Sequence, residues 1–448
     1  MIALCRFALI LLLLGSAAFA ADPLIDLRLL RMDQKTAGLL EKALQDEATG
    51  AAQIEDKLDA LVKGGTLTEL ARFRKQFDTN GGIMSFEKDR ADIKVADGES
   101  LPGGISLEAE AVAGPSGWVD LRLALSRSVQ EGPNRINAER TNTSTIFKSD
   151  QWKIISDWGD ERQATLLLVR FSGTETKDTE LSGRVADVRF RSELRWCEPA
   201  DLKTFGRATE ETRTKATAWL LGKSKPIATS GIRLRGGQKC TQDNLLEWIH
   251  DNNGWDTAAL GWGLEFSNTI SPDGKLIDVQ LMSQWHPLDA KRPPLTPDFS
   301  YQYASTIPSG ATVVIEPKTR PDIGPVPVIF LTPAITSMAE GEKPHYTSTL
   351  PKEGDLGTIT YPVHPSLMRK FTAITSPLHN DDLSLLNAPN LKQMLQNMGM
   401  EFPEGTSASF NASDCTVTLT HKREGHQRFR AILDQNSLSV KVEDKGAP

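Results

Sequence analysis

A long internal duplication is the sequence feature that most constrains the fold. Alternating strand patterns at Leu24–Met32 and Val185–Trp196 each precede a helical stretch and then a short strand that ends in a double glycine. Matching landmarks in the same order indicate repeated structural units. The sequence therefore predicts two β-rich modules of one design, at residues 21–173 and 183–336.

The sharpest landmark is a strand–turn–strand unit that occurs once in each copy. Gly103–Gly117 (GGISLEAEAVAGPSG) corresponds to Gly261–Gly274 (GWGLEFSNTISPDG). The turns lead into alternating strands at Trp118–Leu125 and Leu276–Leu281. Apolar residues at every second position predict half-buried strands, and Pro-Ser-Gly and Pro-Asp-Gly supply the backbone angles of tight hairpin turns.

The amino-acid composition changes after the second copy. Residues 337–378 are rich in Pro, Ser, Thr and Gly, which predicts a linker. Residues 379–448 contain helical patterns at Asn390–Met398 and Gln427–Gln435 with two alternating strands between them. The expected fold class is therefore α+β and β-rich: two tandem β modules with inserted helices, followed by a small C-terminal α/β module.

The first twenty residues have the three properties of a cleavable signal peptide. Arg6 gives a positive start, Phe7–Ala20 is apolar, and small residues stand at Ala18 and Ala20. An uncleaved N-terminal anchor is the alternative. No later apolar run is long enough for a transmembrane helix. We expect an exported protein of the periplasm or outer membrane.

Charge and histidine spacing argue against several functions. The formal net charge of −7 gives no electrostatic basis for binding nucleic acid. The seven histidines are scattered without metal-ligand spacing, and no G-x-S-x-G or phosphate-loop motif occurs. We therefore expect no metal, no cofactor and no enzymatic activity.

Three cysteines remain after the expected cleavage. Cys197 and Cys240 fall in the same predicted module, and an oxidising compartment permits a disulfide between them. Free buried thiols are the alternative reading.

Two further groups of side chains are candidates for function. Trp248, Trp255 and Trp262 recur every seven residues and, if exposed, could stack on sugar rings or contact a partner protein; if buried, they fill a core. Asp157, Asp160 and Glu161 imitate the paired carboxylates of a glycosidase, although such clusters more often form a solvated loop.

The series GGISLEAEA, GPSG, VDLRL and TLLLVRF, with Pro272-Asp273-Gly274 and Thr332-Pro333, resembles the core domain of secretins. These are the outer-membrane channel subunits of type II and type III secretion and type IV pilus systems. The unit from Leu391 to Leu433 is similar to the small ring-building modules found with secretins. Two departures matter: Glu316-Pro317 stands where secretins have a double glycine, and the ring-building-like module comes last.

The resemblance implies a non-enzymatic envelope protein that forms part of, or associates with, a secretin-like assembly. Its implied partners are other envelope or secretion-system proteins and further copies of itself. The copies are expected to meet through the C-terminal module, since ring-building modules bury one face only when they pack against a neighbour. A soluble exported module that binds glycans or proteins is the alternative.

Overall fold

The computed structural model describes residues 23–45, 50–77, 82–94, 100–114, 117–132, 135–173, 185–249, 257–287, 299–319, 324–339, 349–375 and 390–440. The expected signal peptide lies outside these residues. Within the described ranges, no helix is long and apolar enough to cross a bilayer.

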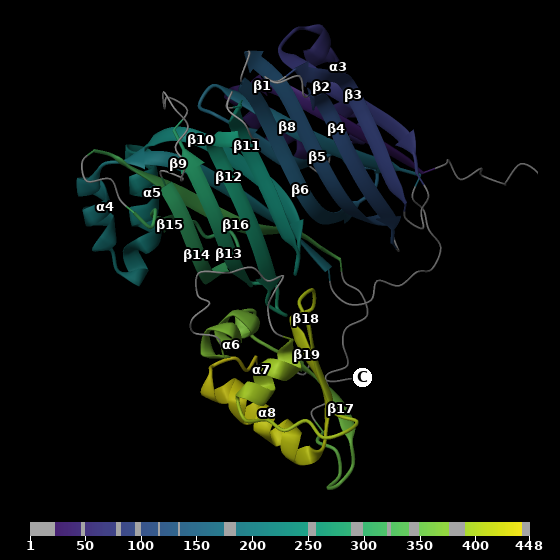
Figure 1. Cartoon of the computed structure of the whole chain (residues 1–448), viewed down its shortest axis with the longest axis vertical. Coiled ribbons are helices and arrows are strands. Elements are labelled where there is room, and N and C mark those ends of the chain that lie inside the picture. Colours follow the sequence, from purple (N-terminus) through teal and green to yellow (C-terminus); the bar gives the residue numbers. More distant parts are fainter. Residues whose placement is uncertain are drawn as a thin grey trace, which may run out of the picture.

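Two eight-stranded antiparallel sheets form the body of the protein (Figure 1). Sheet A runs in the order β15 (Val313–Ile315), β16 (Val326–Ala339), β9 (Val185–Cys197), β10 (Lys225–Arg235), β7 (Lys153–Gly159), β8 (Gln163–Ser172), β1 (Leu24–Asp33) and β2 (Leu67–Gln76). Sheet B runs in the order β14 (Phe299–Pro308), β13 (Leu276–His286), β12 (Thr257–Ile270), β11 (Lys239–Ile249), β6 (Arg135–Lys148), β5 (Trp118–Gly132), β4 (Ser100–Ala113) and β3 (Ile83–Lys94).

The two repeats share both sheets. Strands β1–β8 belong to the first repeat and β9–β16 to the second, and each repeat contributes four neighbouring strands to each sheet. The repeats join head to tail, because β10 pairs with β7 in sheet A and β11 pairs with β6 in sheet B. This pairing satisfies backbone groups that would otherwise form open sheet edges.

Apolar side chains at alternate strand positions face each other between the sheets and form one core for each repeat. The core of the first repeat includes Leu27, Leu121, Leu123, Leu167 and Phe171. The core of the second includes Phe190, Phe266, Val279, Leu281 and Leu331. The expected alternating strands thus form the sandwich.

Each repeat also inserts helices after its first strand. Helices α2 (Gln34–Gln45) and α3 (Ala51–Lys63) pack with the first repeat, and α4 (Pro199–Gly206) and α5 (Arg213–Lys223) with the second. In the first repeat the buried Arg28 guanidinium donates to Asp59 of α3 at 2.7 Å. The second helix pair packs against sheet A through apolar residues, among them Leu202, Phe205 and Leu220.

The described part of the C-terminal unit is a three-stranded sheet with three helices, below the sandwich in Figure 1. Its elements are β17 (Gly357–Pro362), α6 (Leu367–Thr375), α7 (Leu391–Asn397), β18 (Ser407–Asn411), β19 (Thr416–His421) and α8 (Arg423–Gln435). The segment 337–378, expected to be a linker, instead contains β17 and α6. These two elements order because Ile359, Tyr361, Leu367 and Phe371 are buried in the core of this unit.

Candidate functional site

The two cysteines expected to pair are free thiols in this structure. Cys197 packs among apolar residues beneath α4 and α5, whereas Cys240 belongs to the core between the sheets. Burial raises the pKa of Cys197 to about 12 and raises the pKa of Cys240 further still. Both behave as small apolar side chains, which is the alternative that the sequence left open.

Of the three candidate tryptophans, the structure describes the side chain of Trp262 only. Trp255 and the side chain of Trp248 lie outside the described residues. Trp262 lies on β12 and is 5% exposed, and its indole Nε1 donates to Ser283 Oγ at 2.9 Å. Its ring therefore packs between the sheets and is not presented on a loop tip.

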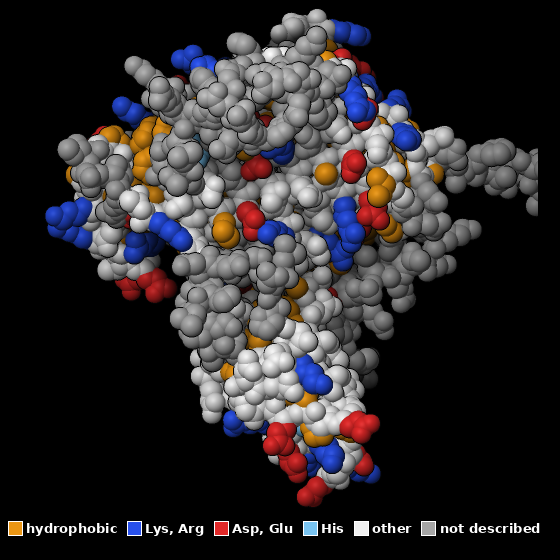
Figure 2. Space-filling view, in the orientation of Figure 1, with side chains coloured by type: hydrophobic (Ala, Val, Ile, Leu, Met, Phe, Trp, Pro, Cys, Tyr) orange, Lys and Arg blue, Asp and Glu red, His pale blue; other side chains and the backbone are white. Residues whose placement is uncertain are grey.

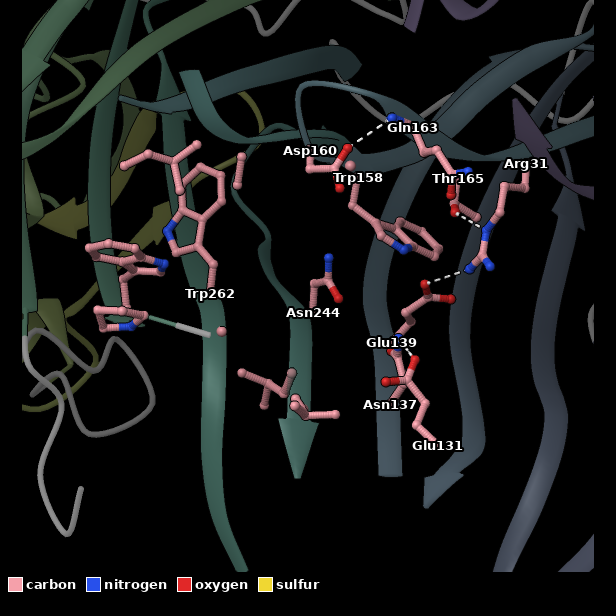
Figure 3. A pocket seen from close by; sticks show the side chains of 18 of the residues that line it. Arg31, Glu131, Asn137, Glu139, Trp158, Asp160, Gln163, Thr165, Asn244 and Trp262 are labelled. Carbon is pink, nitrogen blue, oxygen red and sulfur yellow. Dashed lines mark hydrogen bonds and ion pairs between the residues drawn. The ribbon is translucent and has the colours of Figure 1, made fainter. Parts of the chain in front are cut away.

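Trp262 does border a pocket of about 650 Å³ where the two repeats meet between the sheets. Residues of both sheets and both repeats line this junction pocket. Figure 3 shows Trp158 and Trp262 on opposite sides of it, with Asn244 between them and Glu139 and Arg31 along one wall.

Most charged groups of the junction pocket are already bonded within the protein. Glu139 accepts from Arg31 at 3.2 Å and from Arg127 at 2.7 Å. Asp160 accepts from the backbone amides of Arg162 and Gln163 at 2.7 and 2.8 Å, which caps a turn. Glu139 and Asp160 therefore stabilise the fold, whereas Glu131, the third carboxylate that lines the pocket, accepts only a neutral hydrogen bond among those described, from Asn137 Nδ2 at 3.0 Å.

Two neutral polar atoms at the junction pocket make no hydrogen bond to the described residues. They are the buried indole Nε1 of Trp158 and the side-chain oxygen Oδ1 of Asn137. One is a donor and the other an acceptor, so a neutral ligand with hydroxyl groups matches both.

The carboxylate cluster around Trp158 does not form a glycosidase pair. Asp157 pairs with Arg189 at 3.1 Å, and Asp160 caps the turn described above. Burial raises the pKa of Asp157, and Arg189 opposes that rise. Gly231 opposes Asp157 in the ladder, and a Cβ there would lie 2.1 Å from the carboxylate. Asp157 and Arg189 thus form a structural ion pair that is closely packed against Gly231.

Sequence reasoning missed the polar strand that runs through this junction. The inward positions of β6 carry Asn137, Glu139, Thr141, Thr143 and Thr145, where a core strand is usually apolar. Two of them bond across to the second repeat: Thr145 Oγ1 donates to Asp187 at 2.6 Å, and Thr143 donates to the Arg233 carbonyl. Polar residues on the buried face of a strand were the signal available in the sequence.

Open sheet edges form the second candidate surface. Strands β2 and β3 end the sheets on the side of the first repeat, and β14 and β15 end them on the side of the second. Among the described residues that Figure 2 shows in colour, acidic and basic side chains are interspersed, without a broad patch of one sign.

Among the described residues, no group of His, Cys, Asp and Glu side chains could hold a metal ion. No family model, no curated protein and no solved structure matches this chain.

Proposed function

We propose that the protein is a non-enzymatic structural component of a secretin-like assembly at the outer membrane, in which copies of the chain join head to tail through their sheet edges. The junction between the repeats carries this proposal. There the second repeat adds β10 and β11 to β7 and β6 of the first, which is a heterologous contact between two units of one design.

The same contact can be repeated between chains. The open strands β2 and β3 of the first repeat correspond to β10 and β11 of the second. The open strands β14 and β15 of the second repeat correspond to β6 and β7 of the first. Heterologous contacts generate rings when the rotation closes and filaments when it does not. Strand β14 has no charged residue, whereas the short β15 is followed by Glu316-Pro317, so β14 is the better candidate for pairing at this end. The Ser300 carbonyl of β14 already accepts from the Lys318 amide at 2.8 Å, and the uncharged part of β3 is residues 83–86, so pairing would use the strand beyond Ser300 and these four residues.

The internal ladder fixes the register that such pairing would take. At the junction Gln242 of β11 lies opposite Thr141 of β6. Phe86 occupies the position of Gln242, because each faces the corresponding leucine of the next strand, Leu107 or Leu264. Tyr301 of β14 occupies the position of Thr141 by the same comparison. Phe86 of one copy would therefore oppose Tyr301 of another.

An engineered disulfide tests this register. In the proposed pairing Ser85 opposes Gln302, one position from Phe86 and Tyr301. Directly opposed strand residues lie about 4.5–5.5 Å apart, within the range of a disulfide. The variant Ser85→Cys/Gln302→Cys, purified in its mature form and oxidised, should give a ladder of covalent multimers on non-reducing electrophoresis.

The matched control is Ser85→Cys/Ala304→Cys, which moves one thiol two residues along the same strand face. Diagonal neighbours are about 7–8 Å apart and cross-link poorly. A mature protein that stays monomeric at high concentration, with equal cross-linking of both variants, would exclude head-to-tail assembly. Recovery of the native protein in the outer-membrane fraction tests the proposed location.

A second candidate function is glycan binding in the junction pocket, favoured by the unused hydrogen-bonding capacity of Trp158 and Asn137. Aromatic faces flanking a few neutral polar groups suit the apolar and hydroxylated faces of a sugar ring. Asn137→Leu should weaken retention on a panel of neutral polysaccharides. Retention of wild type and variant that is equal, or absent in both, would dismiss this candidate.

A further inference from the structure

An arginine–aspartate pair closes the junction between the repeats at one end of the sandwich. Arg235, the last residue of β10, pairs through Nη1 with Oδ2 of Asp120 on β5. Directly after Arg235, the chain turns through Gly236-Gly237 from sheet A to sheet B. The pair therefore links the turn between β10 and β11 of the second repeat to sheet B of the first repeat.

Both partners have counterparts at the open ends of the chain. Asp278 on β13 corresponds to Asp120, since each lies in the same place of the same strand pattern, VDLRL or IDVQL. Arg74 on β2 corresponds to Arg235, since they oppose the equivalent aspartates Asp26 and Asp187. Arg74 is exposed, and no described residue forms an ion pair with it.

Asp278 is covered by the C-terminal unit. Its side chain is 4% exposed, and Arg369 of α6 donates to Oδ1 at 2.7 Å through Nη2. Arg369 Nε lies 3.2 Å from both carboxylate oxygens, and Thr306 adds a hydrogen bond at 2.7 Å. An arginine from another part of the chain thus occupies the position that Arg235 occupies at the internal junction.

The other polar contacts described between this unit and the sandwich are long: Arg369 Nη2 lies 3.5 Å from Thr306 Oγ1, and Ser413 Oγ lies 3.5 Å from the Gly236 carbonyl. Ala412 and Ser413 also pack against Gly237, and a pocket of about 530 Å³ lies between the two parts. A buried carboxylate is costly to leave unpaired. Arg369 therefore leaves Asp278 most readily when another arginine replaces it.

We infer that Asp278 is the docking point for Arg74 of a second copy of this chain, and that Arg369 covers it until that copy arrives. The inference rests on the proposed head-to-tail assembly and says how that assembly is regulated. The C-terminal unit then restrains assembly, because its Arg369 occupies the place of the incoming arginine. When Arg74 of the second copy replaces Arg369 at Asp278, docking of that copy releases the C-terminal unit.

The test compares assembly of the mature protein and its variants by sedimentation velocity, with the cysteine pair Ser85→Cys/Gln302→Cys as a second readout. Arg369→Gln should lower the protein concentration at half assembly by on the order of tenfold, the scale of one interfacial charge pair. Arg74→Gln should raise it by a similar factor and should cancel the gain of Arg369→Gln in the double variant.

Controls separate docking from folding. Arg74 is exposed, so Arg74→Gln should leave the thermal unfolding midpoint unchanged. Lys57→Gln removes the same charge from an exposed position on α3 of the same repeat and should leave assembly unchanged. In the Arg369→Gln background, Asp278→Arg should abolish assembly, and adding Arg74→Asp should restore it.

Two outcomes would overturn the inference. If every variant assembles as the wild type does, head-to-tail assembly stands and the exchange of arginines is wrong. If neither the wild type nor Arg369→Gln assembles or cross-links at any concentration, the proposed function fails together with this inference.

Discussion

The internal junction and the open edges are built from equivalent strands but carry different side chains. At the junction, Gln242 Nε2 donates to Ser156 Oγ at 3.0 Å and to the Asp157 carbonyl at 2.9 Å, while Ser230 donates to Gln242 Oε1. At the equivalent open positions stand Phe86 and Tyr301, each buried in the core of its own repeat.

The difference distinguishes the permanent contact at the internal junction from the reversible contact proposed at the open edges. Polar groups buried at the junction are satisfied only when both repeats are in place, so that contact forms as the chain folds. The open edges complete their own cores with aromatic rings and need no partner for folding. In the proposed assembly, contacts between these edges would therefore depend on protein concentration and on the C-terminal unit.

The largest effect is expected from Arg189→Ala at the junction. Arg189 pairs with Asp157 of the first repeat and with Glu41 of α2. Its removal leaves two carboxylates without their cation, which should cost about 3–5 kcal/mol of unfolding free energy. Urea denaturation checks this. Arg162→Ala is the control, because that side chain is 85% exposed and its loss should change little.

Phe86→Gln would place the junction residue at the open edge. With no repeat across β3, the glutamine finds no equivalent of Ser156 or of the Asp157 carbonyl, and the buried phenyl ring is lost. We expect a loss of about 2–3 kcal/mol in the free energy of unfolding, measured by chemical denaturation. An unchanged free energy would show that the edge does not depend on apolar closure.

The converse change is Gln242→Leu. The leucine leaves Ser230 and the Asp157 carbonyl without their hydrogen bonds, which should cost about 1–3 kcal/mol. Gln130→Leu on the exposed end of β5 is the matched control and should stay within about 0.5 kcal/mol of the wild type. Equal effects at the two sites would remove the distinction between junction and surface.

The smallest effect is a pH dependence at Asp157. Because burial raises its pKa, its contribution to stability is present below the ordinary carboxyl pKa of about 3.9 and is lost as the pH rises through the folded-state value. Asp157→Asn lacks this titration. The variant should gain stability relative to the wild type as the pH rises, measured by thermal unfolding from about pH 4 to about pH 7. A constant difference across this range contradicts the assignment.

Local patterns in the sequence predicted the strands well. The alternation at Leu24–Met32 and Trp118–Leu125 falls within β1 and β5, and Pro272-Asp273-Gly274 forms the turn between β12 and β13, where Gly274 has a φ of 69°. These features depend on neighbouring residues alone, which is why a single sequence reveals them.

Long-range features were beyond local reasoning. Pairing of β10 with β7 and of β11 with β6 depends on strands far apart in the chain, so the sharing of both sheets by the repeats could not be read from periodicity. Strand β17 forms only against β19, which lies beyond the presumed linker. Trp262 was a surface candidate because its distant partner Ser283 was unknown.

The head-to-tail junction has an arithmetic consequence. Each chain carries two units of one design, already joined by the contact that would link chains. A closed assembly through these edges therefore always holds an even number of units, whatever its number of chains. Every second contact around it is covalently continuous, so such an assembly comes apart only in steps of two units.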